Sequence, residues 1–232
     1  MATFGLIHGA WHGAWCWERL IPELERRGHR AVAVDLPCDD PGATTMDNAK
    51  LVADSLAYVD RDGDDLVVVG HSLGGITAAV VPLLRPVRKV VLLAALVPRP
   101  GCSLAEVMSS EPDTTTEEFD SLPRHVGPGG AVTWDPQVAG PFFYRACDPE
   151  TARWAAARLR TQVWTTSREP CPLEQWPDCE LVSIVCTEDE LLRPAWSRRI
   201  ARDVLGIEPV ELPGGHFPML SIPGRLADTL TA

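Results

Sequence analysis

Short apolar runs recur along the chain and are separated by polar or turn-forming segments. They lie at residues 3–8, 31–35, 65–70, 88–95, 180–186 and 207–212. Most of these runs are apolar throughout and do not alternate with polar residues, which is the pattern of strands buried on both faces of a sheet. We therefore predict a six-stranded, mainly parallel sheet.

Helical patterns lie between these runs. In residues 15–27, apolar side chains recur with helical spacing from Trp17 to Leu24, Gly28 follows the predicted end, and Pro22 is a candidate for a kink. Further helices are expected at 46–60, 73–84, 194–205 and from about Pro223. Strands that alternate with helices in this way predict an α/β fold with a doubly wound sheet.

Residues 98–178 interrupt the alternation. They are rich in proline, threonine, acidic residues and tryptophan, and they separate two strands that a normal crossover joins with far fewer residues. We interpret this segment as an inserted, mostly helical cap (lid) on a core formed by residues 1–97 and 179–232. Helices within it are expected at 103–109, 115–121 and 149–160.

Composition and charge narrow the possible partners, metal sites and location of the protein. The 232 residues, 45% of them apolar, suit one sizeable core, and the net charge of −11 disfavours a nucleic-acid or anionic-membrane partner. We see no signal-peptide pattern and no apolar run long enough to span a bilayer. The seven cysteines lack CxxC spacing, so we expect neither a zinc site nor a complete disulfide framework, and a cytoplasmic protein.

The motif GHSLGG, residues 70–75, stands between the apolar run LVVVG and the stretch ITAAVVPLL. It matches G-x-S-x-G in the strand-turn-helix context that this motif requires. Gly70 and Gly74 would let neighbouring backbone pass closely, leaving Ser72 strained and exposed at the carboxyl edge of the sheet. A capping serine in a glycine-rich turn is the simpler alternative, but the context favours a nucleophile backed by a helix N-terminus.

A serine hydroxyl needs a base to become a nucleophile. His216 lies in the glycine-flanked loop LPGGHFPML, after the last predicted strand, and holds the last place in the order Ser, acid, His. A solvated loop histidine is the alternative. Of the other histidines, His8 and His71 are expected to buttress loops and His29 to face solvent. The remaining two, His12 and His125, are expected near a ligand.

The acid can be narrowed to one loop but not to one residue. The run VSIVC delivers the acidic residues 188–190 to the carboxyl edge of the sheet, where functional groups gather in parallel sheets. An acid there would orient His216 and stabilise its imidazolium. Asp35 and Asp39 are rivals, although they precede the serine and more plausibly shape the loop LPCDDPG.

The loop HGAWHGAW, residues 8–15, follows the first predicted strand. With the strand order 2-1-3-4-5-6, this loop and the serine turn open onto one crevice. We therefore predict an oxyanion hole formed by the backbone N–H groups of Ala10 and Leu73. A structural turn with Trp15 and Trp17 in the core is the alternative.

Aromatic residues of the insertion predict an apolar pocket above Ser72. A single aromatic residue is more often a packing residue than a ligand contact, so the prediction rests on the set. The pocket residues that we expect are His12, Trp134, Phe143, Trp164 and Phe217.

Four segments together resemble the α/β-hydrolase superfamily, in particular plant methyl esterases, hydroxynitrile lyases and their bacterial relatives. They are LIHGAWHGAWCWERLIPELERRGHRAVAVDLP, VVVGHSLGG, VCTEDELLRPAW and GGHFPML. The resemblance spans the core and covers the insertion only loosely. It implies Ser72 as nucleophile, Asp189 as acid and His216 as base, with Ala10 and Leu73 as oxyanion donors.

The resemblance leaves Glu188 and Glu190 as solvent-facing or loop-forming residues, with Glu188 as the fallback acid. It also bears on the reaction, because the plant lyases carry a lysine after the histidine and a threonine at the position of Ala10. This chain has Phe217 and Ala10 there, which favours hydrolysis.

We thus expect a serine carboxylesterase that needs no cofactor or metal and cleaves a small, largely apolar ester through an acyl-enzyme. A cofactor-free lyase or oxygenase on the same scaffold and a non-catalytic small-molecule receptor are the alternatives. We expect no nucleic-acid or membrane partner, and an exposed helix or cap aromatics would suit a homodimer.

Overall fold

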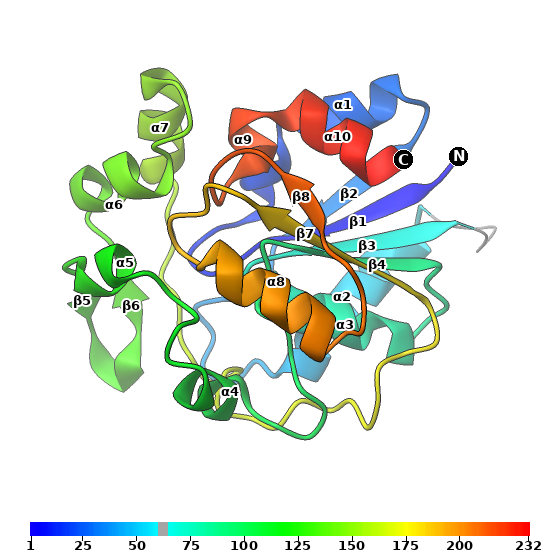
Figure 1. Cartoon of the computed structure of the whole chain (residues 1–232), viewed down its shortest axis with the longest axis horizontal. Coiled ribbons are helices and arrows are strands. Elements are labelled where there is room, and N and C mark those ends of the chain that lie inside the picture. The colour runs from blue at the N-terminus through cyan, green and yellow to red at the C-terminus, as the bar shows by residue number, and fades with distance from the viewer. Residues whose placement is uncertain (60–64) are drawn as a thin grey trace.

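The computed structural model describes residues 1–59 and 65–232. Its main sheet has the strand order β2-β1-β3-β4-β7-β8, and every neighbouring pair is parallel. The strands are β1 (Thr3–Ile7), β2 (Arg30–Val34), β3 (Leu66–His71), β4 (Lys89–Leu93), β7 (Glu180–Cys186) and β8 (Val210–Leu212). The predicted fold class and strand order are confirmed (Figure 1).

Two predicted strands are shorter than expected, for local reasons. The run at 88–95 ends as a strand at Leu93, because Ala94 has a φ of 42° and turns the chain. The run at 207–212 becomes a strand only at Val210, since Pro209 has no N–H to donate to a neighbouring strand.

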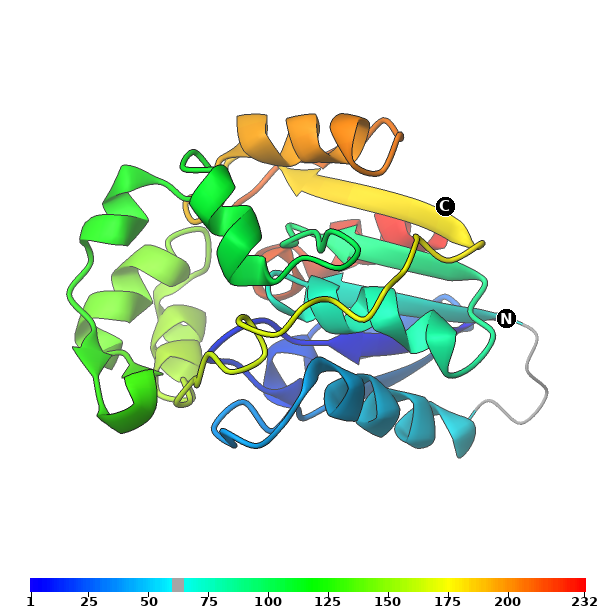
Figure 2. The ribbon, with the colours of Figure 1, turned by 90° about the horizontal axis from the view of Figure 1, so that it is seen from below.

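Helices cover both faces of the sheet (Figures 1 and 2). On one face lie α1 (Ile21–Arg26), α9 (Pro218–Ser221) and α10 (Pro223–Thr231), which bury their apolar side chains with β1 and β3. On the other lie α2 (Thr45–Ala57), α3 (Gly74–Val80) and α8 (Pro194–Asp203). The sheet is therefore doubly wound, as predicted.

The predicted helix 15–27 is divided in two. A 3-10 helix, η1 (Ala14–Trp17), precedes α1, and Pro22 lies in the first turn of α1 and not in a helix interior. Proline suits a first turn, where its missing N–H costs no hydrogen bond, so the helix starts there and is not kinked. Likewise α3 gives way to a 3-10 helix, η2 (Val81–Leu83), at Pro82.

Helix α2 begins with a capping box. The Thr44 hydroxyl accepts a hydrogen bond from the Asp47 N–H, and the Asp47 carboxylate accepts one from the Thr44 N–H. The helix was expected over 46–60; it ends at Ala57, and the final residue of that prediction lies outside the described residues.

Most of the elements between β4 and β7 project from the edge where the parallel strands end, and the chain before β7 runs back along the core to the start of that strand (Figures 1 and 2). Its elements are α4 (Leu104–Ser110), α5 (Glu117–Ser121), β5 (His125–Val126), η3 (Pro128–Gly130), β6 (Val132–Thr133), α6 (Pro136–Phe143) and α7 (Pro149–Ala156). The hairpin β5-β6 and helix α6 were not predicted. Helix α6 contains Gly140 and Pro141, which have poor helix propensity, and Asp135 caps its N-terminus.

Candidate active site

Ser72 lies in the turn between β3 and α3 and is partly exposed. Its φ of 52° is in the left-handed region, which an L-residue occupies only when neighbouring structure holds it there. Two backbone hydrogen bonds do so: Ser72 N–H donates to the Leu93 carbonyl over 3.1 Å, and Leu96 N–H donates to the Ser72 carbonyl over 3.0 Å. The end of β4 therefore fixes the conformation of the serine turn.

The glycines of the turn sit where no side chain fits. A Cβ on Gly74 would lie 2.5 Å from the carbonyl oxygen of His8, and a Cβ on Gly70 would lie 2.6 Å from the Gly74 carbonyl oxygen. The turn thus packs directly against the backbone that leaves β1. Glycine lets this first loop lie against the serine turn.

His216 and Asp189 form a buried pair. The Nδ1 atom of His216 lies 2.7 Å from Oδ2 of Asp189, and the two residues are 1% and 7% exposed. The second Asp189 oxygen, Oδ1, accepts the N–H groups of Leu191 and Leu192, each at 2.9 Å. These bonds leave Oδ2 facing the imidazole.

The second ring nitrogen of His216 has no partner within the described residues. Because Nδ1 donates to the Asp189 carboxylate, Nε2 carries the lone pair of the neutral ring, and this atom is buried. Its position in a buried pair gives the imidazole the ability to take up a proton, with Asp189 stabilising the resulting charge.

His71 holds the loop that carries His216. Its Nε2–H donates to the backbone carbonyl of His216 over 2.8 Å, and the two rings are 4.7 Å apart. Burial lowers the pKa of His71 well below its ordinary value, so this ring stays neutral. His8 similarly braces its own loop through Leu36, whose N–H donates to His8 Nε2. The predicted buttressing role is confirmed for both histidines.

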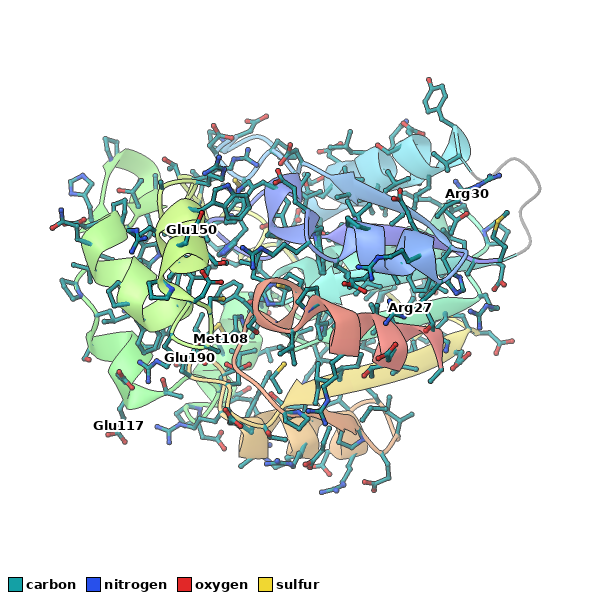
Figure 3. The ribbon with its side chains drawn as sticks, turned by 90° about the horizontal axis from the view of Figure 1, so that it is seen from above. Arg27, Arg30, Met108, Glu117, Glu150 and Glu190 are labelled. Carbon is teal, nitrogen blue, oxygen red and sulfur yellow. The ribbon has the colours of Figure 1, made fainter. Side chains whose placement is uncertain are left out.

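Glu190 corrects one sequence-based interpretation. We expected this residue either to face solvent or to shape its loop. Its exposure of 7% rules out the first alternative, whereas Glu188 is exposed. Its Oε2 accepts the backbone N–H of His216 over 3.3 Å and lies against Gly215, where a Cβ would be 2.7 Å away. Burial raises the Glu190 pKa to about 7. The carboxyl therefore points to the loop that carries His216, and Glu190 lies on the side of the sheet that faces the chain between β4 and β7 (Figure 3).

The rival acids lie at a different contact. Asp35 accepts the N–H of Ala14 over 2.7 Å, and Arg160 lies 3.4 Å from Asp35 and 3.6 Å from Asp39. Both carboxylates are largely exposed. They hold the loop after β2, as the sequence suggested.

The first loop lies against Ser72. A Cβ on Gly9 would be 2.8 Å from the Ser72 Cβ. Within residues 1–59 and 65–232, neither the Ala10 N–H nor the Leu73 N–H donates a hydrogen bond. Two backbone donors thus remain uncommitted in the loops that flank the serine.

Aromatic rings fill the space beside the first loop. Trp11 is their centre, with ring centroids of four neighbours 5.3 to 6.2 Å away: Phe119, Trp134, Phe143 and Trp164. Three of these neighbours come from the pocket prediction, and Phe217 joins the cluster through Phe143 at 6.0 Å. Trp11 was not predicted as a pocket residue, because its only signal in the sequence is its place in HGAW beside the predicted donor Ala10.

His12 and His125 differ in setting. His12 is buried, and both of its ring nitrogens are hydrogen-bonded inside the protein, to Ala10 and to Tyr144. His125 lies exposed in β5. Whether either contacts a ligand stays a prediction.

No group of three or more His, Cys, Asp or Glu side chains in residues 1–59 and 65–232 is arranged to hold a metal ion. In the same ranges, no helix is both long and apolar enough to cross a membrane.

Comparisons with known proteins agree with this architecture. The sequence model described as "Alpha/beta hydrolase family" matches residues 6–229. The chain is 26% identical over 244 residues to methylesterase 7 of Arabidopsis thaliana, covering 98% of this chain and 94% of the relative. It is 28% identical over 247 residues to an alpha-hydroxynitrile lyase of Arabidopsis thaliana, covering 99% of this chain and 95% of the relative. The crystal structure of polyneuridine aldehyde esterase superposes with a TM-score of 0.81 at 22% identity, covering 100% of this chain and 98% of that one.

Proposed function

The chain belongs to the alpha/beta hydrolase family, and from this premise we propose that it is a serine carboxylesterase acting on a small, largely apolar ester. Ser72 is the nucleophile, His216 the general base and acid, and Asp189 the residue that orients and stabilises His216. The observation that carries the proposal is the buried bond of 2.7 Å between His216 Nδ1 and Asp189 Oδ2, which leaves Nε2 with a free lone pair.

The first half of the reaction forms an acyl-enzyme. His216 Nε2 takes the proton of the Ser72 hydroxyl while Oγ attacks the ester carbonyl carbon. The carbonyl oxygen becomes an anion and accepts hydrogen bonds from the Ala10 and Leu73 N–H groups. Each such donor is worth about 10²–10³-fold in rate in comparable enzymes. The protonated imidazole then donates its proton to the departing alkoxide, and the alcohol leaves.

The second half uses the same groups in reverse. His216 Nε2 takes a proton from a water molecule, whose oxygen attacks the acyl carbon. The Ser72–acyl bond breaks, and the imidazolium returns its proton to Ser72 Oγ. The carboxylic acid leaves and the enzyme is regenerated. No step requires a metal or an organic cofactor.

The aromatic cluster supports an apolar substrate. In this proposal, residues 98–178 form a cap, and Trp134, Phe143, Trp164 and Phe217 present ring faces and edges to the substrate, with Trp11 at their centre. Apolar surfaces with few polar groups favour ligands of the same character. The methylesterase relative has a name that fits this class.

A lyase reaction is the second candidate, because one relative is an alpha-hydroxynitrile lyase. Cleavage of that kind uses the base without an acyl-enzyme and releases an anion that a nearby cation stabilises. Here the residue after His216 is Phe217, whose ring packs against His12 and Phe143. This aromatic environment supports hydrolysis over anion release.

Labelling with a fluorophosphonate probe tests the nucleophile. We expect the probe to modify Ser72 in the wild-type protein and to leave Ser72→Ala unmodified. Lack of labelling, beside a control hydrolase that is labelled, would overturn the serine mechanism. An ester panel of increasing acyl length, run on both proteins, identifies the acyl group, and negligible turnover with an intact label would indicate a receptor.

A further inference from the structure

One buried hydrogen bond between two side chains joins the inserted segment to the first loop. Tyr144, which follows α6, has its hydroxyl oxygen 2.8 Å from Nε2 of His12. The other ring nitrogen, Nδ1, lies 2.7 Å from the backbone carbonyl oxygen of Ala10. Both Tyr144 and His12 are 1% exposed, so water does not compete for either bond.

The chemistry of the acceptor fixes every proton in this chain of bonds. A carbonyl oxygen can only accept, so Nδ1 of His12 carries the hydrogen and donates to Ala10. Nε2 therefore carries the lone pair and accepts the Tyr144 O–H. Burial lowers the His12 pKa to about 3, which keeps the ring neutral and the direction of both bonds unchanged near neutral pH.

Packing holds the His12 ring in place. It stacks between Trp15 and Phe217, with centroid distances of 5.1 and 4.7 Å and interplanar angles of 24° in both cases. Phe217 in turn meets the His216 ring edge-on at 5.0 Å. The His12 ring thus lies between the first loop and the loop that carries the proposed base.

The backbone held by His12 is in an unfavourable conformation. Trp11 has a φ of 63°, in the left-handed region, and four hydrogen bonds hold the peptide units on either side of it, one of them from the His12 N–H to the Gly9 carbonyl over 3.4 Å. The Ala10 carbonyl accepts from His12, the Trp11 N–H donates to Gln162 Oε1 over 3.4 Å, and the Trp11 carbonyl accepts the Arg160 N–H over 2.7 Å. Residues 160 and 162 belong, like Tyr144, to the segment between β4 and β7.

We propose that Tyr144 and His12 are positioning residues for the oxyanion hole: the Tyr144 hydroxyl fixes the His12 ring, and His12 holds the two peptide units that flank the Ala10 Cα. The His12 ring holds the Ala10 carbonyl, and the His12 backbone N–H, together with the His8 ring, holds the Gly9 carbonyl of the peptide unit that carries the Ala10 N–H. The Ala10 N–H thereby keeps its direction toward the substrate oxygen. This inference rests on the proposed serine mechanism and deepens it. Its consequence is that the inserted segment does more than enclose a substrate, because it also sets the geometry of a donor in the core.

Two substitutions test this relay of hydrogen bonds from Tyr144 through His12 to the Ala10 carbonyl. Tyr144→Phe deletes only the hydroxyl, and His12→Phe keeps a stacking ring but deletes both hydrogen bonds. With an ester turned over by the wild type, we expect kcat to fall about fivefold in Tyr144→Phe and up to about 10²-fold in His12→Phe, with KM little changed. The chain has two tyrosines, and the other, exposed Tyr58, gives the matched control Tyr58→Phe, which should match the wild type.

The double variant separates a relay from two independent packing roles. Because Tyr144 acts only through His12, His12→Phe/Tyr144→Phe should be no slower than His12→Phe alone. His12→Asn places an amide donor near the position of Nδ1, so it should recover part of the activity lost in His12→Phe. Independent, multiplicative losses in the double variant would overturn the relay.

A trifluoromethyl ketone provides a second readout. Its adduct with a nucleophilic serine places an oxyanion in the hole, so inhibition should weaken by the same factor as kcat/KM across these variants. Wild-type kinetics in Tyr144→Phe, with Ser72 labelled and turning over, would overturn the relay alone. Absence of both label and turnover in the wild type would overturn the proposed function. NMR of the histidine rings tests the Tyr144–His12 hydrogen bond without any turnover. His12 should be the tautomer with its hydrogen on Nδ1, and the chemical shift of its Nε2 should change in Tyr144→Phe.

Discussion

The imidazole of His216 donates from Nδ1 to Oδ2 of Asp189 across 2.7 Å, and both side chains are buried. Backbone N–H groups at Leu191 and Leu192 occupy the other oxygen of that carboxylate. The loop after β7 therefore holds Asp189 as an acceptor and presents one oxygen to the ring. This arrangement sets the tautomer of His216 before any substrate arrives.

Asp189→Asn should reduce kcat by about 10⁴-fold. The asparagine oxygen would keep the hydrogen bonds from the Leu191 and Leu192 N–H groups, so the NH₂ group would face Nδ1 of His216. Nδ1 must then accept a hydrogen bond, and the ring proton moves to Nε2. A protonated Nε2 cannot act as the base. Steady-state ester kinetics measure the effect, and equal Tm values of the variant and the wild type show that the fold is intact. Glu190→Gln is the control, because glutamine can still accept the backbone N–H of His216. The kcat of this variant should stay within a few-fold of the wild-type value. A crippled Glu190→Gln beside an active Asp189→Asn would move the acid to Glu190.

Ser72→Gly should abolish turnover and at the same time stabilise the fold. At a φ of 52°, glycine avoids the penalty of about 1 kcal/mol that a side chain pays in the left-handed region. Ser72→Ala removes the same hydroxyl and keeps the Cβ, so it should be equally inactive without that gain. Urea unfolding of the three proteins measures the difference. Equal midpoints for the alanine and glycine variants would show that the turn is relaxed at Ser72.

The sequence allowed the sheet and the serine turn to be predicted because both have local signals. Apolar runs mark strands buried on both faces, and Gly70 and Gly74 mark a turn that admits no side chain. Two relationships escaped prediction because they depend on tertiary contacts. The inward turn of Glu190 depends on its packing against Gly215. The Tyr144–His12 bond joins two residues that are 132 positions apart in the chain, and Tyr144 lies in a segment whose helical pattern is weak.

Gly74→Ala should destabilise the protein by about 2 kcal/mol or more. The new methyl would lie 2.5 Å from the His8 carbonyl oxygen and 2.8 Å from that of Ile7, both of them backbone atoms. Gly224→Ala in α10 is the matched control, since its methyl would approach nothing closer than 3.6 Å. Alanine favours a helix over glycine by up to about 1 kcal/mol, so this variant should be more stable. Chemical denaturation that ranks the two variants alike would argue against the close packing of β1 and the serine turn.

Glu190→Gln should stabilise the protein at pH 8 and have little effect at pH 4. Burial raises the pKa of Glu190 to about 7, above its ordinary value, so the folded state holds this proton after the unfolded chain has released it. As pH rises from about 4.5 through 7, the native state therefore loses stability, by about 3 kcal/mol at the upper end. Glutamine carries no such cost, and the advantage of the variant should grow across this range. Tm measured from pH 4 to 8 tests this, with exposed Glu188→Gln as the control that should follow the wild type. Parallel curves for Glu190→Gln and the wild type would mean that the carboxyl ionises as it does in water.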